Sequence, residues 1–403
     1  MRRPGRSRCR ASHSRCRIPR PASGTPSGRP APTACVSSSG PGSVTKWPRW
    51  RSTGRSRPMT CRRDGREPQF FLEKSGGAVK VGTWIPCYRS WVRGDEVLRL
   101  ATTAENLAFD SLWVQDHLVA PVGGLEDTRV EPVRQWLDIE EYGNKEFTAV
   151  EYYGEENWWL DPYMLWGFLA GSTTKIELGS SVIVLPYRDP VVQAKMLGTL
   201  DVLSKGRMLF GIGVGHVEAE FNAIGVSPAQ RGLRTDEYIR VIRQMLRGEE
   251  FDFAGRFTQL PTIRPLIKSP QQPSPPVLVG GNSRRAVRRA VELGDVWLPA
   301  RLEPEQVRTG RRYLEEQAAE QGVPCPGIAV SLIWGISDPK APYTGKSLRK
   351  FLSVENAAEL LNEYADLGVQ HVTIDLPNPS ERILMRQLEL LTEAVVKSGV
   401  RAN

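Results

Sequence analysis

The chain has 403 residues, of which 25% are charged and 40% hydrophobic, and its formal net charge is +9. All of the excess positive charge lies in residues 1–66, where sixteen Arg and one Lys oppose a single acid, so that this leader carries +16 and residues 67–403 carry −7. The sequence contains no apolar run long enough to span a bilayer, and its six Cys are too scattered for a disulfide framework or a metal knuckle. We therefore expect a reduced, cytoplasmic protein without a membrane or metal partner.

The leader, residues 1–66, contains no Leu, Phe or Tyr, so it cannot bury enough apolar surface to fold and we expect it to be disordered. No apolar segment follows Arg2 and Arg3, which argues against a twin-arginine export signal. One interpretation is a nucleic-acid-binding tail whose arginines contact phosphates. The favoured alternative is a start codon assigned too far upstream in arginine-rich coding DNA, with Met59 or a position near Val79 as the true start.

Downstream of the leader, eight apolar runs typical of strands alternate with eight segments of helical period. The strands are expected at residues 79–85, 111–114, 176–185, 208–213, 276–279, 295–298, 328–334 and 371–376. The helices are expected at residues 94–106, 162–171, 190–203, 231–246, 283–293, 304–321, 354–367 and 380–397. This alternation predicts an α/β fold, a (β/α)₈ TIM barrel over residues 79–403. A doubly wound dinucleotide fold would carry a Gly fingerprint after its first strand, where Pro86 and Cys87 stand instead.

Residues 121–161 interrupt the alternation between the second strand and the second helix. They are acidic and rich in aromatic residues, namely Trp136, Tyr142, Tyr152, Tyr153, Trp158 and Trp159. Long loops in compact domains are usually functional, which predicts a lid over an apolar or aromatic substrate. A homodimer contact is the alternative, because rigid aromatic residues are also enriched at interfaces.

Ligands of such barrels bind where the strands end at their carboxyl side. The residues expected at these ends are Trp84, Asp116, His117, Ser181, Val182, Gly213 to His216, Gly280 to Asn282, Arg301, Trp334 and Asp375. This set lacks the opposed acid pair of a glycosidase and a convincing metal-ligand spacing. Trp84, His216 and Trp334 are candidates for the walls of a substrate pocket.

Four segments resemble the bacterial luciferase-like monooxygenase superfamily, and within it the reductases and dehydrogenases that use coenzyme F-420, a deazaflavin. They are SLWVQDHLV (111–119), LGSSVIVLPYRDPVVQAKMLGTLDVLSKGRMLFGIGVG (178–215), RGLRTDEYIRVIRQMLRGEEFDFAGRF (231–257) and PPVLVGGNS (275–283). The resemblance implies a luciferase-like barrel with a cis peptide at Ser181-Val182 against the central ring of the cofactor. It also places His117 near the reacting ring carbon, where an imidazole can act as acid or base. Asp116 either orients His117 or caps a turn.

The glycines at the ends of two further strands are candidate cofactor contacts. Gly213, Val214 and Gly215 would let the ring approach bare backbone, although a tight turn explains these glycines equally well. The sugar-phosphate dehydrogenases of the superfamily carry Glu where this chain has His216, which leaves the substrate open.

A second candidate cofactor contact runs from Gly280 through Gly281 and Asn282 to Ser283. This segment leads into a helix whose first amides could bind a phosphate. Two pairs of arginines follow, beginning at Arg284 and at Arg288, and they face either the oligoglutamate tail of the deazaflavin or solvent.

The sequence thus predicts an oxidoreductase that transfers hydride between coenzyme F-420 and a small organic substrate. The alternative within the superfamily is an FMNH2-dependent monooxygenase that uses molecular oxygen. A third hypothesis, from another class, is a non-catalytic barrel with a basic tail that binds nucleic acid.

Overall fold

The computed structural model of the protein describes residues 78–120, 158–340 and 350–400. The leader, residues 1–66, and most of the inserted segment, residues 121–157, lie outside the described residues, so the expectations for them stay predictions.

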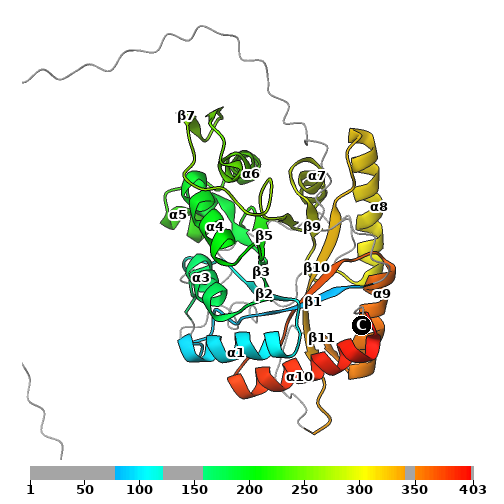
Figure 1. Cartoon of the computed structure of the whole chain (residues 1–403). Helices are drawn as coiled ribbons and strands as arrows, with labels where there is room; N and C mark the ends of the chain where they lie inside the picture. Colours follow the sequence, from blue (N-terminus) through cyan, green and yellow to red (C-terminus); the bar gives the residue numbers. More distant parts are fainter. Residues whose placement is uncertain (1–77, 121–157, 341–349, 401–403) are drawn as a thin grey trace, which may run out of the picture. The chain divides into compact units, whose positions relative to one another are not determined.

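Eight parallel strands close into a barrel with helices around it (Figure 1). The strands are, in their order around the barrel, β1 (Lys80–Trp84), β2 (Ser111–Val114), β3 (Glu177–Ser180), β5 (Met208–Gly213), β8 (Val277–Gly280), β9 (Val296–Leu298), β10 (Gly327–Ile336) and β12 (His371–Asp375). The barrel closes because β12 pairs with both β10 and β1. The predicted (β/α)₈ fold is confirmed.

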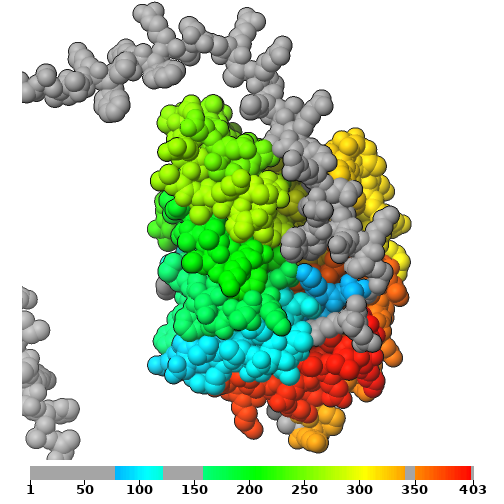
Figure 2. All heavy atoms as spheres, viewed as in Figure 1, coloured from blue at the N-terminus to red at the C-terminus, as the bar shows by residue number. Residues whose placement is uncertain are grey.

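The helices outside the barrel follow the strands in the expected alternation. They are α1 (Gly94–Asn106), α3 (Pro162–Ser172), α4 (Pro190–Leu203), α6 (Arg231–Arg247), α7 (Arg284–Leu293), α8 (Pro304–Gln321), α9 (Val354–Asp366) and α10 (Glu381–Ser398). In the space-filling view α1 lies between α3 and α10, and together they cover one side of the barrel (Figure 2). None of the described helices is long and apolar enough to cross a membrane.

Side chains at the helix starts explain why these boundaries could be read from the sequence. The Asp161 carboxylate accepts hydrogen bonds from the Tyr163 and Met164 amides, and Asp189 caps α4 in the same way. Each cap is followed by a proline at the first helical position, where the missing N–H costs nothing.

Several short elements of the described residues were not expected from the sequence. They are the short helix α5 (Glu218–Ala223), the antiparallel hairpin of β6 (Phe251–Ala254) and β7 (Gln259–Ile263), and the edge strand β11 (Lys350–Leu352). The predicted third strand is divided into β3 and β4 (Ile183–Val184), which pairs with β5, and a 3₁₀ turn, η2 (Leu185–Tyr187), follows. The hairpin residues are intermediate or exposed, so they lack the unbroken apolar run that identifies the barrel strands.

The interior of the barrel is filled by side chains. Trp84 and Trp113 lie in it together with apolar residues of β5, β8, β9 and β10. Trp113 fits because Gly82 and Gly179 leave room for its indole, since a Cβ at either position would lie less than 3 Å from it. Because the interior is occupied, a ligand has space only at the mouth of the barrel, where the strands end.

Candidate functional site

The loop between β3 and β4 joins three strands at the mouth of the barrel. The peptide bond between Ser181 and Val182 is cis, as expected. The Ser181 amide donates to the Val114 carbonyl at the end of β2 (2.9 Å), and its hydroxyl donates to that of Ser331 on β10 (3.1 Å). The loop is therefore fixed on both sides.

The Val182 side chain lies between the ends of β5 and β8. A Cβ placed on Gly213 would lie 2.5 Å from Val182 Cγ2, and one placed on Gly280 would lie 2.6 Å from Val182 Cγ1. These distances are too short for real atoms, so both glycines are required by the packing of Val182. The Val182 side chain thus occupies space beside Gly213, where we expected a cofactor ring to approach the bare backbone, and it also packs against Gly280.

We predict that Gly213→Ala weakens cofactor binding and lowers the free energy of unfolding by about 1–3 kcal/mol, because overpacking displaces Val182. Val182→Ala removes the clashing methyl groups, so the double variant should recover part of the loss of Gly213→Ala. Urea unfolding and cofactor titration of the two single variants and the double variant measure the coupling. Additive losses would contradict the packing explanation.

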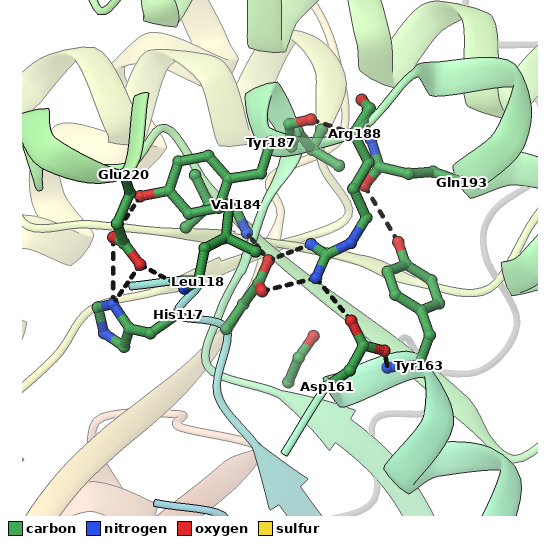
Figure 3. Close-up of polar contacts among 12 residues, drawn as sticks. His117, Leu118, Asp161, Tyr163, Val184, Tyr187, Arg188, Gln193 and Glu220 are labelled. Carbon is green, nitrogen blue, oxygen red and sulfur yellow. Dashed lines mark hydrogen bonds and ion pairs between the residues drawn. The ribbon is translucent and has the colours of Figure 1, made fainter. Parts of the chain in front are cut away.

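His117 follows β2 and contacts a buried carboxylate, that of Glu220 on α5 (Figure 3). The His117 Nδ1 atom lies 3.1 and 3.2 Å from the two Glu220 oxygens. The Leu118 amide and the Tyr187 hydroxyl each donate to Glu220 at 2.6 Å. Burial favours the neutral carboxyl, but the hydrogen bonds with His117, Tyr187 and the Leu118 amide outweigh it and hold the pKa of Glu220 below its ordinary value.

Asp116, the neighbour of His117, has a different partner. Its carboxylate is fully buried and forms a bidentate ion pair with Arg188 (2.7 and 3.0 Å), and it also accepts the Val184 amide (3.1 Å). Burial raises the pKa of Asp116, and the Arg188 guanidinium and the Val184 amide counteract that rise. Arg188 also contacts Asp161, the cap of α3 (Figure 3). Asp116 therefore ties β2 to the chain after β4, and the carboxylate that contacts His117 is that of Glu220.

Aromatic rings surround His117 on its other sides. Trp159, from the end of the inserted segment, meets the imidazole edge-to-face at 4.5 Å, and Tyr88 lies 5.2 Å beyond Trp159. The ring of His216 lies 6.3 Å from that of His117. The part of the insertion that is described thus reaches the site, whereas Trp158 is exposed.

Positive charge gathers around His216. The surrounding protein lowers the pKa of His216 by desolvation, and the charges of Arg231 and Arg301 add to this effect. The Arg231 Nε donates to the Gly215 carbonyl at 3.0 Å, which holds its guanidinium beside the end of β5. Arg301 follows β9 in a left-handed conformation (φ 59°), an uncommon one for a residue with a side chain. The mouth is therefore suited to a ligand that carries an anionic group.

The segment after β8 forms the helix start that the sequence predicts. Ser283 caps α7 by accepting the Ala286 amide (3.2 Å), and Gly281 has a φ of +125°, which side chains rarely adopt. The Asn282 side chain donates from Nδ2 to the Ala300 carbonyl and accepts at Oδ1 from the Ala300 amide, both at 2.9 Å. It therefore joins the ends of β8 and β9.

The arginines of α7 divide into two groups. In the first group, Arg289 forms an ion pair with Asp236 of α6, and Arg284 lies over the ring of Tyr313 of α8. Arg285 and Arg288 are exposed. The first amides of α7 and these exposed guanidiniums could hold a phosphate and further negative charge.

Trp84 and Trp334, the two tryptophans expected in the substrate pocket, lie on opposite sides of the barrel wall. Trp84 lies in the barrel interior, where its indole N–H donates to Thr373 (2.9 Å). Trp334 is buried on the outer side of β10 and packs near Tyr364 of α9, with 6.4 Å between the ring centres. Residues alternate between the two faces of a strand, and Trp334 has the outward position. The structure therefore does not bring Trp334 together with the other site residues.

Sequence reasoning missed the partners of the two polar site residues, Glu220 and Arg188. Glu220 follows His216 by four residues, but a single buried acid on a six-residue helix has no distinguishing pattern. Within the described ranges, no cluster of three or more His, Cys, Asp or Glu side chains could hold a metal ion.

A (β/α)₈ barrel with a cis peptide after its third strand and a histidine at its mouth agrees with the family that the sequence resembles. The model of the family described as luciferase-like monooxygenase matches residues 75–341, more than half of the chain. The chain belongs to this family.

Curated relatives match parts of the chain. An uncharacterized protein of Mycobacterium tuberculosis is 29% identical over 208 residues, which are 52% of this chain and 66% of that protein. A second protein of this bacterium, whose name assigns it provisionally to the coenzyme F-420-dependent oxidoreductases, is 31% identical over 179 residues, or 41% of this chain and 51% of its own length. The chain thus spans less than two thirds of the length of these relatives.

Solved structures share the fold at low sequence identity. An F-420-dependent secondary alcohol dehydrogenase, in complex with an F-420–acetone adduct, has a TM-score of 0.62 at 16% identity and covers 80% of this chain and 99% of its own. The oxygenating constituent of 3,6-diketocamphane monooxygenase of Pseudomonas putida, in complex with FMN, has a TM-score of 0.59 at 17% identity, with coverages of 79% and 98%.

Proposed function

We propose that this chain is an oxidoreductase that transfers hydride between coenzyme F-420 and a small organic substrate at the mouth of the barrel. The proposal rests on the hydrogen bond that connects the cis-peptide loop at Ser181-Val182 to the strand end that carries His117. The Ser181 amide bonds the end of β2 at Val114, three residues before His117, so the loop at Val182 and the imidazole have a fixed relation. A ring held on this loop would lie where His117 can serve it.

The residues at the mouth fit a cofactor of this kind. The start of α7, with Gly281 and Ser283, suits its phosphate, and the exposed Arg285 and Arg288 suit a tail of carboxylates. When bound, the cofactor supplies the hydride chemistry. His117 gives or takes the proton that accompanies the transfer, and Trp159 limits access of water to the imidazole.

An FMNH2-dependent monooxygenase is the second candidate. It is favoured by the structural similarity to an FMN-bound oxygenating enzyme and by the guanidinium of Arg231 at the end of β5, which gives a second place for a phosphate. In that case molecular oxygen is a co-substrate, and Trp159 and Tyr88 would form the aromatic wall of the pocket.

Titration of the purified protein with coenzyme F-420 and with FMN, side by side, distinguishes the two candidates. We expect the deazaflavin to bind more tightly, and its absorbance to change when candidate alcohols or carbonyl compounds are added. Tight binding of FMN alone, together with oxygen consumption, would overturn the first proposal.

Charge reversal on α7 tests the contact with the tail of the cofactor. We predict that Arg285→Glu/Arg288→Glu weakens coenzyme F-420 more than FMN, because only the oligoglutamate tail extends beyond the phosphate. Added salt should reduce the difference, since exposed charges are screened over about 8–10 Å. Arg308→Glu on α8, where Arg308 forms an exposed pair with Glu305, is the matched control. Equal losses of affinity for both cofactors would mean that these arginines face solvent and do not contact the tail.

A further inference from the structure

We infer that Glu220 is a positioning residue that selects the protonation pattern of the His117 ring. It fixes the proton of the neutral imidazole on Nδ1 and thereby makes Nε2 the nitrogen that exchanges a proton with the ligand. The inference concerns a tautomer, so it can be tested in the resting protein, although its role in turnover rests on the proposed function.

Glu220 can only accept hydrogen bonds. Its low pKa keeps it ionised, and an ionised carboxylate has no proton to donate. The Leu118 amide and the Tyr187 hydroxyl already donate to it from fixed positions at 2.6 Å. The third group at 3.1–3.2 Å, His117 Nδ1, must therefore carry a proton.

The other titratable groups near His117 do not determine which of its ring nitrogens is protonated. The Asp116 carboxylate is directed to Arg188 and the Val184 amide, with both of its oxygens bound. His216 lies 6.3 Å away between ring centres, beyond hydrogen-bond distance, and its lowered pKa keeps it neutral. Glu220 is thus the carboxylate that bonds the His117 ring among the described residues.

The Glu220 carboxylate is held in a fixed orientation toward His117. The Glu220 side chain is fully buried, and its three donors come from two segments, the chain after β2 with His117 and Leu118, and η2 with Tyr187. The carboxylate is therefore oriented before any ligand arrives. When the Nδ1 proton is fixed, the lone pair of the neutral ring resides on Nε2. This nitrogen can accept the proton of a substrate hydroxyl as hydride leaves the carbon that bears the hydroxyl, and it can return the proton in the reverse direction.

Glu220→Gln is the decisive variant, because an amide has nearly the shape of the carboxylate but can donate. If its oxygen takes the Oε1 position and accepts the Leu118 amide, its NH₂ group takes the Oε2 position, 3.2 Å from His117 Nδ1, and a hydrogen bond from this group requires Nδ1 to be the acceptor. We expect the tautomer to invert to Nε2–H, and kcat to fall by about 10²–10⁴ with little change in cofactor affinity. Glu218→Gln, on the exposed face of the same helix, is the matched control and should change neither.

Nitrogen-15 NMR of histidine-labelled protein reads the tautomer directly, since protonated and unprotonated ring nitrogens have separate chemical shifts. The chain has only four His, so single substitutions assign the signals. We expect Nδ1–H in the wild type, in Glu220→Asp and in Tyr187→Phe, which all keep the carboxylate, and Nε2–H in Glu220→Gln.

A wild-type ring in the Nε2–H form would overturn the inference, even if Glu220→Gln does not fold. Retention of Nδ1–H in a folded Glu220→Gln would overturn it as well. The proposed function fails on a different result, namely no binding of coenzyme F-420 by a wild type whose ring has the expected tautomer. The two failures are therefore distinguishable.

Discussion

Replacement of His117 by Ala is expected to lower kcat by about 10²–10⁴ and to leave the dissociation constant of the cofactor nearly unchanged. The magnitude is that of a lost general acid or base. Cofactor affinity should persist because the loop at Val182 and the start of α7 do not depend on the imidazole. The side chain is partly exposed, so its removal creates no sealed cavity. Single-turnover measurements under saturating cofactor test the chemical step.

Two controls separate a chemical role for His117 from a structural one. Added imidazole should restore part of the rate of His117→Ala, because it can occupy the vacated space and carry the proton. Glu218→Ala, on the exposed side of α5, should keep the wild-type rate. If His117→Ala retains the wild-type rate while chemistry limits turnover, the imidazole has no part in the reaction.

The barrel could be predicted from the sequence because its elements have local signatures. The strands are unbroken apolar runs that are buried on both faces, and helices such as α4 begin at an Asp followed by a Pro. The β6–β7 hairpin and β11 were missed for the opposite reason, because their residues are partly exposed and form no unbroken apolar run. Local sequence patterns therefore reveal an element only when its residues form one continuous buried segment.

The site could be predicted only in part, because its decisive contacts join residues far apart in the chain. His117 follows the predicted strand 111–114, and Ser181 lies within the predicted strand 176–185 and is placed at its mouth end by the family resemblance. Glu220 lies 103 residues from His117, and Arg188 lies 72 residues from Asp116, and neither pairing has a local signature. The expectation that Asp116 orients His117 used proximity in sequence, but β2 directs the two side chains to different partners.

The glycines show the same limit. Gly213 is predicted to let a cofactor ring approach bare backbone, and Gly280 is predicted to belong to the segment that leads to a phosphate site. Both glycines leave space, but a side chain from β4's preceding loop, Val182, fills it. A glycine in sequence indicates that something approaches the backbone closely, and only the fold identifies what approaches.

The ion pair of Arg188 and Asp116 is expected to give the largest effect on stability. Arg188→Ala leaves the fully buried Asp116 carboxylate without its guanidinium, so we expect the free energy of unfolding to fall by about 3–5 kcal/mol. Asp116→Ala/Arg188→Ala removes both charges and should recover part of this loss. Arg308→Ala, which breaks an exposed pair, should cost less than about 1 kcal/mol. Urea unfolding at constant pH measures all three.

The pH dependence of the Arg188→Ala loss identifies the unpaired charge as its cause. Burial raises the pKa of Asp116, and the variant lacks the guanidinium that counteracts the rise. A group whose pKa is higher in the folded than in the unfolded state favours folding when it is protonated, and this contribution is lost as the pH rises through the folded-state pKa. The destabilisation should therefore be smallest in acid, grow as the pH increases, and then level off once Asp116 is ionised. A loss that is constant across this range would assign the effect to missing packing of the Arg188 side chain against the Tyr163 ring, which lies 5.4 Å from the guanidinium carbon, and not to charge.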